Sequence, residues 1–381
     1  MAEYYAEYDR RPRRRRTSLA MRLVDGIVTL LSLAAAAAMI LTFLVPWIDP
    51  GRVWFLPLVG LAAPVTYVAT VVLALWWVIR WRLLRASLMM ALVVGGLFRL
   101  SLYYKPAIRR VYDNETFGRG TFKVMTYNVR SFYGERGENS AGGVLRLIAE
   151  QEPDIVCLQE FNARLAERSS EYAWLEETYQ STAFGRTQAP DSLYGAPLVI
   201  LSKYRILRSG VALTPSASVW ADVLMGRDTV RIFNNHLRST AIKASDGDYI
   251  ASHRFLSDSA GETRIRSMVT RLRDNSILRA AQVDSISAAI AASRPQRIVC
   301  GDFNDTPVSY VYHRMARGLN DAFRVCGSDY SHTFRGFWNM LRIDYVLSSP
   351  QFETLSYEVL PATWSDHLPV VVRLRRTQSN N

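Results

Sequence analysis

The first 104 residues are dominated by long runs without charge. Gly26 to Ile48 contains 23 residues and Val53 to Ile79 contains 27, and neither run holds Lys, Arg, Asp or Glu. About 20 apolar residues are enough for a helix to span a bilayer. The pattern therefore predicts two membrane spans, over about 24–48 and 53–79. A signal peptide is the alternative for the first run, but the run exceeds the usual apolar region and no clear cleavage site follows it.

A third apolar run, Ala86 to Phe98, has 13 uncharged residues before Arg99. Continued to Tyr104 it is long enough to cross, with Arg99 near the end, where its side chain can reach the interface. By itself this run fits an interfacial or re-entrant helix equally well. We expect a third span over about 86–104, so that residues 23–104 form a membrane anchor.

The arginines predict how this anchor is oriented. Six lie between residues 10 and 16 in the N-terminal arm, residues 1–22, and Arg80, Arg82 and Arg85 follow the second run. Between the first two runs the charged residues are only Asp49 and Arg52. Positive residues stay cytoplasmic, so the arm and the segment after the second run lie inside. Three spans place everything after residue 104 outside the cytoplasmic membrane, whereas two would keep it inside.

A polar connector over 105–120 leads to a region of alternating strand and helix patterns, residues 121–376, which a short tail, 377–381, follows. Strands are predicted over 121–129, 154–158, 196–202, 206–213, 218–224, 229–237, 298–300, 343–347, 354–360 and 368–374, and helices over 143–150, 262–292 with a break at 274–276, and 307–317. Many strands with few helices fit two packed sheets with helices outside better than a doubly wound parallel sheet. The predicted fold class is therefore α/β.

Polar side chains recur where the predicted strands end. The clearest case follows the apolar strand 298–300, where Asp302 and Asn304 point to one side of an extended chain and Phe303 to the other. A carboxylate beside an amide can hold a metal ion or aim a water molecule. The remaining members of this pattern are Asn128, Glu160, His236, Asp344, Asp366 and His367.

Each of these residues has an ordinary explanation when taken alone. An asparagine after a strand is commonly a turn residue, and a histidine in an apolar run is commonly a hydrogen-bonded core residue. Buried carboxylates and imidazoles, however, cost stability unless they are paired. The repetition of such groups at strand ends therefore indicates a functional site.

The net charge of +12 lies mostly outside this region. Residues 1–120 hold 16 Lys and Arg against 7 Asp and Glu, whereas residues 121–381 hold 30 against 27. The basic character belongs to the anchor, where it sets topology and meets anionic lipid headgroups, and it is poor evidence for nucleic-acid binding. Cys157, Cys300 and Cys326 provide no zinc spacing and no disulfide framework, and the first two lie in apolar runs.

Six short motifs, in this order along 121–376, resemble those of the endonuclease/exonuclease/phosphatase superfamily: Met125-Thr126-Tyr127-Asn128, Leu158-Gln159-Glu160, Asn235-His236-Leu237, Gly301-Asp302-Phe303-Asn304, Ile343-Asp344-Tyr345 and Ser365-Asp366-His367-Leu368-Pro369. The resemblance implies a four-layer α/β sandwich and a metal-dependent phosphoesterase using Mg²⁺, with Mn²⁺ as an alternative. It does not extend to residues 1–120, which look like the anchor of some bacterial members.

The resemblance also implies roles for single residues. Asn128 and Glu160 correspond to the metal-binding pair, and Asp366 to a further acid near the metal. Asp302 corresponds to the group that aligns or activates the attacking water, and Asn304 helps to position that water and the phosphate. The implied phosphate-contacting pair is His236 and His367, with Asp344 orienting His367. The tyrosine that some nucleases use has only two candidates here, Tyr194 and Tyr249.

The substrate is left open by this pattern, because the fold and catalytic core are shared by nucleases and lipid phosphatases. The near-neutral domain and the tether favour a lipid-linked or extracytoplasmic phosphoester over duplex DNA. A tethered nuclease and a non-catalytic membrane scaffold are the alternatives. Specificity is expected in loops 238–261 and 327–341; the second holds Phe334, Phe337 and Trp338, which could line an apolar rim or pack the loop. The bilayer is the expected partner, and the sequence indicates no obligate protein partner.

Overall fold

The computed structural model describes residues 18–106, 120–181, 198–214, 217–240, 249, 261–294 and 296–377. The chain forms two compact units, one of residues 1–40 and 64–96, the other of residues 41–63 and 97–381. The basic arm up to residue 17, most of the connector, most of the loop 238–261, Tyr194 and the tail after residue 377 lie outside the described residues.

The N-terminal part of the chain is helical. Helix α1 covers Leu19–Leu44, α2 Leu56–Leu61, α3 Ala63–Ile79 and α4 Leu83–Leu100. By length and composition, α1 and α4 are able to cross a membrane, and α3 is an apolar helix of 17 residues. The span expected over 53–79 is thus divided into α2 and α3. Pro64 lies at the second position of α3, where a missing backbone N–H breaks no helical hydrogen bond.

The first unit has a polar pair inside and apolar side chains outside. Arg80 donates to both carboxylate oxygens of Asp25 at 3.1 Å, and the indole of Trp77 donates to Ser32 at 2.9 Å. Many large apolar side chains are more than half exposed; among them are Leu30, Leu31, Leu33, Val65, Val68, Val72 and Leu88. Water would oppose such exposure, so this surface is suited to lipid.

The second unit contains two six-stranded mixed sheets. One has the order β10 (Asn320–Asp321), β12 (Asp344–Ser348), β9 (Arg297–Asp302), β8 (Asp228–His236), β7 (Ser218–Met225) and β6 (Ile206–Val211). The other has the order β13 (Phe352–Val359), β14 (Val370–Arg376), β2 (Thr121–Asn128), β3 (Ile155–Gln159), β5 (Val199–Ser202) and β4 (Gln180–Ser181). A separate pair joins β1 (Tyr104–Lys105) to β11 (Asp329–Tyr330).

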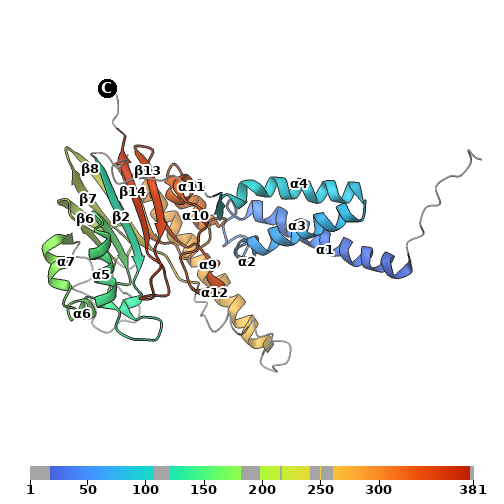
Figure 1. The fold of residues 1–381 in the computed structure, drawn as a ribbon, viewed down its shortest axis with the longest axis horizontal. Coiled ribbons are helices and arrows are strands. Elements are labelled where there is room, and N and C mark those ends of the chain that lie inside the picture. The colour runs from blue at the N-terminus through green and yellow to red at the C-terminus, as the bar shows by residue number, and fades with distance from the viewer. Residues whose placement is uncertain are drawn as a thin grey trace, which may run out of the picture. The chain divides into compact units, whose positions relative to one another are not determined.

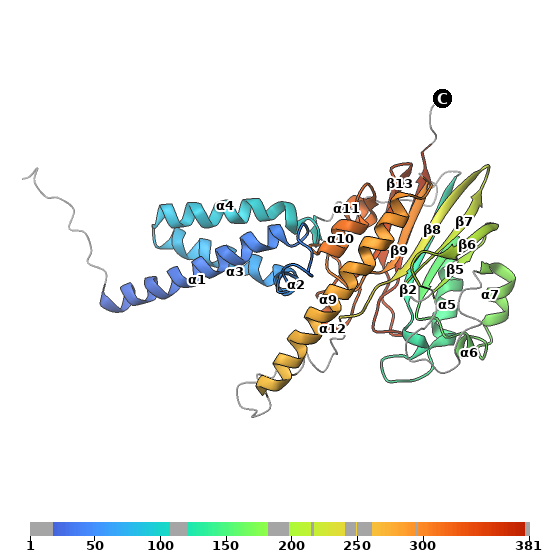
Figure 2. The same cartoon turned by 180° about the vertical axis from the view of Figure 1, so that it is seen from behind.

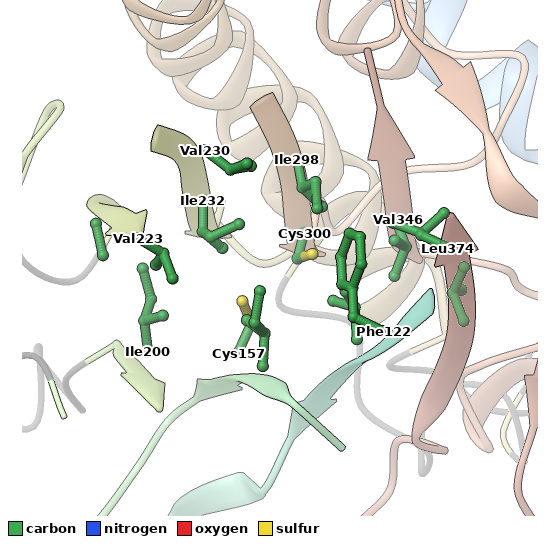
Figure 3. Close-up of a cluster of buried hydrophobic side chains, with 14 of the residues drawn as sticks. Phe122, Cys157, Ile200, Val223, Val230, Ile232, Ile298, Cys300, Val346 and Leu374 are labelled. Atoms are coloured by element: carbon green, nitrogen blue, oxygen red, sulfur yellow. The ribbon is translucent and has the colours of Figure 1, made fainter. Parts of the chain in front are cut away.

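The two sheets pack face to face around one apolar core (Figure 3). Cys157 and Cys300 lie in this core as buried free thiols, as expected for small apolar side chains. Helices α5 (Ala141–Gln151), α6 (Ala163–Ala166) and α7 (Tyr172–Thr178) cover the outer face of the sheet that contains β2 (Figure 1). Helices α9 (Gly261–Ala291) and α10 (Tyr310–Met315) cover the sheet that contains β9 (Figure 2). The predicted two-sheet α/β fold is confirmed.

Helix α9 corrects one detail of the sequence prediction. The polar residues 274–276 predict a break, but α9 continues through them. Asn275 accepts a hydrogen bond from Arg238 at 2.9 Å, and Ser276 accepts one from Arg279 at 3.4 Å. Asn275 thus has a tertiary partner and Ser276 has a side-chain partner one turn later in the helix, so neither competes with the helical backbone.

Candidate active site

Strand pairing gathers the predicted site residues at one end of the sandwich. Strands β2 and β3 run parallel, as do β8 and β9, so each pair ends at the same edge of its sheet. Register pairs His236 with Asp302, and Asp302 with Asp344 at the start of the antiparallel strand β12. In the facing sheet, Asn128 is paired with the residue before Glu160. Residues far apart in sequence therefore meet because the strands that carry them end together.

Gly301 makes this arrangement possible on β9. Its φ is +129°, and a Cβ there would lie 2.0 Å from the carbonyl oxygen of Asn235 on the neighbouring strand. No other residue fits that approach without moving the backbone. Glu160 and Asn304 also have positive φ, at 54° and 53°. Such left-handed backbone in residues other than glycine concentrates at functional sites, where the surrounding structure holds it in place.

Asn128 joins the two acids of the site. Its amide nitrogen lies 3.2 Å from Oε1 of Glu160 and 3.1 Å from Oδ2 of Asp302. Asp302 is buried, and its Oδ1 accepts from the backbone N–H of Asn304 at 2.8 Å. The side-chain amide of Asn304 donates to Oδ2 of Asp302 at 3.1 Å and to the carbonyl of Leu237 at 2.9 Å. Three hydrogen bonds thus fix the carboxylate of Asp302.

His367 lies between two buried carboxylates. Its Nδ1 is 3.0 Å from Oδ2 of Asp344, and its Nε2 is 3.7 Å from Oδ2 of Asp302. Burial disfavours the charged imidazole, but the negative charges of Asp344 and Asp302 outweigh it and raise the pKa of His367 to about 10. The backbone N–H of Asp344 donates to Thr333 at 3.0 Å. His367 is therefore an imidazolium at neutral pH.

His236 approaches the same acids from the other side. Its Nε2 lies 3.6 Å from Oε1 of Glu160 and 3.7 Å from Oδ2 of Asp302. The side chain is 19% exposed, compared with 7% for His367. Two imidazoles therefore present nitrogens to one carboxylate oxygen, at the base of an open pocket.

All the predicted site residues except Asp344 line one cavity of about 270 Å³. Asp366 is on its wall, and its carboxylate lies 3.6 Å from Nε of Arg130, so the structure pairs this acid with an arginine. Phe334 and Phe337 of the predicted specificity loop line the cavity, and Trp338 is 56% exposed. Tyr249 is buried and lies under the guanidinium of Arg264, 4.0 Å from its ring centroid.

Two lining arginines were missed by the sequence analysis. Arg130 follows the Asn128 motif by two residues, and its positive φ of 47° opens a tight left-handed turn. Arg279 is buried on α9, where it lies 3.3 Å from Asp305 and donates to the carbonyl of Arg238 at 2.5 Å. An arginine in the apolar stripe of a helix was the available signal, since buried charges require partners.

Glu160 offers a carboxylate oxygen that fits a hard divalent cation. Asn128 offers its amide oxygen only if the amide turns, because its Nδ2 faces the two acids and its Oδ1 accepts from the backbone N–H of Arg130 at 3.0 Å. Glu160 and Asp302 direct carboxylate oxygens at the same point, and Glu160 is 31% exposed toward the cavity. Mg²⁺ prefers oxygen ligands and keeps several waters, so few protein donors are needed. In the described part of the chain, Asp302, Asp344 and His367 also have ligand atoms within 4.8 Å of one another. In that trio His367 already faces both carboxylates, whereas Glu160 is open to the cavity, so Glu160 is the better-placed ligand.

Comparison with known proteins gives the family. Residues 125–367 match the model of the Endonuclease/Exonuclease/phosphatase family, a range that holds the first five motifs and the sixth as far as His367. The chain belongs to this family. Its members are metal-dependent phosphoester hydrolases. Residues 25–103 match a domain of unknown function (DUF8431), and a search of curated proteins finds no match.

Several solved structures are similar to part of this chain. An endonuclease/exonuclease/phosphatase from Beutenbergia cavernae is 19% identical, with 68% of this chain and 72% of that chain covered and a TM-score of 0.46. The human Nocturnin catalytic domain, solved with a sulfate anion, is 20% identical, with coverages of 68% and 95% and a TM-score of 0.46. A family protein from Bacteroides thetaiotaomicron is 19% identical, with coverages of 68% and 98% and a TM-score of 0.47.

Proposed function

We propose that this protein is a membrane-anchored, Mg²⁺-dependent phosphoesterase whose substrate is a lipid-linked or extracytoplasmic phosphoester. The observation that carries the proposal is the convergence of Asn128, Glu160, His236, Asp302 and His367 on one cavity. A metal ion bound at Glu160 and Asn128 would polarise the phosphoryl group and balance its charge. Hydrolysis also needs a positioned water and hydrogen-bond donors to the phosphoryl oxygens. An acceptor side chain can orient the water, and the histidines can donate to the phosphate.

Asp302 is suited to align the attacking water. Its carboxylate is fixed by Asn128 and Asn304, so an incoming water meets an acceptor in a single orientation. Oδ2 also lies 3.7 Å from the Nε2 atoms of both histidines. A phosphate between the two imidazoles would lie next to this acceptor, which takes the proton as the water attacks.

The histidines are suited to hold the phosphate. His367 carries a positive charge maintained by Asp344, and its Nε2 donates toward the cavity side of Asp302. His236 supplies a second nitrogen from β8. Preorganised donors of this kind stabilise charge that develops on the phosphoryl oxygens. Asp366, paired with Arg130 on the cavity wall, is the third acid within reach of a metal or its waters.

The N-terminal helices support a membrane anchor with the catalytic domain on the outer side. Both α1 and α4 are long and apolar enough to cross a bilayer, and Arg80, Arg82 and Arg85 surround the α3–α4 turn. With the basic arm also cytoplasmic, α1, α3 and α4 carry the catalytic domain to the outer side of the cytoplasmic membrane. The domain after residue 120 has almost no net charge, which does not favour a groove for several phosphates of DNA.

The proposal is tested with the full-length protein in nanodiscs against a lipid phosphate, bis-4-nitrophenyl phosphate and plasmid DNA. We expect phosphoester hydrolysis in Mg²⁺, loss of activity in EDTA and its return when Mg²⁺ is restored. The lipid or the dye is hydrolysed while plasmid stays intact. Nicked plasmid would instead establish a tethered nuclease, and no hydrolysis of any of the three would contradict an enzymatic role.

Substituting Asp344→Asn should move the alkaline limit of activity. His367 must be protonated to donate to phosphate, and its protonated form is lost as pH rises through its raised pKa. Removing the charge of Asp344 removes a main cause of that raised pKa, so the alkaline limb of kcat shifts down by about 1–3 pH units. A pH–rate profile of wild type and variant measures this shift. Asp228→Asn, at the opposite end of β8, is the control and should keep the wild-type profile.

A further inference from the structure

The catalytic cavity has an apolar wall that comes partly from the chain between α1 and α3. Pro57 and Leu61 of α2 line the cavity together with Phe334 and Phe337. Pro57 and Leu61 are four residues apart, so they lie on one face of α2. The catalytic residues line the same cavity, so the phosphate site and these apolar side chains share one space.

Helix α2 is seated firmly on the catalytic unit, to which residues 41–63 belong. Gly60 is buried, and a Cβ there would lie 3.8 Å from Val308. Ala63, directly after α2, packs in the core cluster that also contains Phe303 of the Asp302 motif. The ring of Trp47 lies 4.2 Å, centroid to centroid, from that of His313. The apolar wall is thus part of the folded catalytic unit.

The same connection carries side chains suited to a membrane surface. Trp47, Trp54 and Phe55 are 66%, 46% and 39% exposed. Tryptophan prefers the interface between lipid and water, and this segment joins two apolar helices. With the proposed membrane anchor, α2 would lie at the level of the lipid headgroups, and its residues Pro57 and Leu61 line the catalytic cavity.

Loop 327–341, which also lines the cavity, holds its aromatic residues in an unusual backbone conformation. Phe337, Trp338 and Asn339 all have positive φ, between 52° and 57°. For bulky side chains this conformation is unfavourable and persists only where the surroundings impose it. It places Phe337 in the cavity wall and leaves Trp338 exposed. The apolar wall is therefore built from α2 and from this loop.

Resting on the proposed hydrolysis, we propose that this wall binds the hydrocarbon chain of the substrate next to the phosphate. The substrate class is a single- or double-chain lipid phosphate ester whose phosphate reaches His236 and His367 while its first methylene groups lie against Leu61 and Phe337. A phosphoester without such a chain fills only the polar half of the cavity. Leu61 and Phe337 are specificity-determining residues for lipid over water-soluble phosphates.

Chain-length selectivity tests the proposal in the full-length protein reconstituted in nanodiscs. The probes are butyl and dodecyl phosphate and the 4-nitrophenyl diesters of both, and the readout is the ratio of kcat/KM for twelve carbons over four. Leu61→Asn and Phe337→Asn should each lower this ratio by about tenfold, the value of one buried apolar side chain. Asparagine tolerates the backbone of Phe337. Val59→Asn, on the face of α2 away from the cavity, should leave the ratio unchanged.

The control separates binding in the cavity from partitioning into the bilayer. A long chain concentrates in nanodiscs whichever variant they contain. Only a lower kcat/KM ratio in the Leu61 and Phe337 variants, with no change in the control, therefore supports binding of the chain at the apolar wall. An equal ratio in all four proteins would overturn the proposal while leaving the phosphoesterase intact.

A binding experiment gives a result even without turnover. Dodecyl phosphate with a diazirine near its first carbons is photolysed with the protein in EDTA, and labelled peptides are mapped by mass spectrometry. Labels within 57–61 and 334–341 that are lost with excess unlabelled dodecyl phosphate support the wall. Labels confined to α1, α3 and α4 overturn it. Cavity labelling without any hydrolysis would contradict the proposed function alone.

Discussion

Replacing Asp302 by asparagine is expected to lower kcat by about 10²–10⁴-fold, the usual contribution of a positioned general base. The amide has the same shape, but it cannot take a proton from water. Asparagine can still accept from the backbone N–H of Asn304, so the local fold is retained. KM should change little, because the histidines that face the phosphate stay in place. Steady-state kinetics of full-length protein with Mg²⁺ and a phosphoester dye measure both constants.

The control for this substitution is Asp228→Asn. Asp228 begins β8 and His236 ends it, so the control changes an aspartate in the same sheet at the far end from the site. We expect wild-type kcat for Asp228→Asn. Unchanged turnover in Asp302→Asn would show that another group aligns the water, while near-UV circular dichroism separates a lost function from a lost fold.

Several parts of the fold could be read from local sequence. Runs such as Ile298–Cys300 are apolar and β-branched, and they form buried strands because nothing in them competes with that structure. The site was visible for the same reason: Asp302 and Glu160 are polar residues directly after such strands. Parallel pairing of β2 with β3 and of β8 with β9 then brings their ends together. The chemical roles of these residues remain predictions.

Other features depend on contacts that no local pattern encodes. Residues 274–276 look like a helix break, yet α9 continues through them, and Arg238 from outside the helix binds Asn275. Residues 53–79 read as one uncharged run, but α2 separates from α3 because it packs on the catalytic unit at Val308. Arg279 was overlooked since its partner Asp305 is 26 residues away in sequence. In each case the deciding interaction is tertiary.

A second large effect is expected from a buried ion pair beneath the site. Arg342 is fully buried and lies two residues before Asp344, which begins β12. Its guanidinium donates to both carboxylate oxygens of Asp321, at 2.9 and 3.2 Å, and to the carbonyl of Leu102 at 3.1 Å. Burial opposes the charge, but the carboxylate of Asp321 outweighs it, so the pKa of Arg342 is raised. One side chain thus joins the sheet to the segment that leaves α4.

Arg342→Met should lower the free energy of unfolding by about 3–5 kcal/mol, because it leaves the carboxylate of Asp321 buried without its cation. Tyr312 and the backbone N–H of Phe323 still donate to Asp321, but neither supplies positive charge. For a domain of this size, Tm should fall by about 10 °C, measured by intrinsic fluorescence of the full-length protein.

The double variant Arg342→Met, Asp321→Asn identifies the cause of that loss. An amide at 321 removes the unpaired charge, keeps an oxygen that accepts from the N–H of Phe323, and has an NH₂ group that can donate to the hydroxyl of Tyr312. The double variant should therefore be more stable than Arg342→Met alone. If the two substitutions instead destabilise additively, the effect of Arg342 comes from its contacts with Leu102 and the surrounding rings. Arg375→Met, which breaks an exposed pair with Glu353, is the matched control and should change the stability by no more than about 1 kcal/mol.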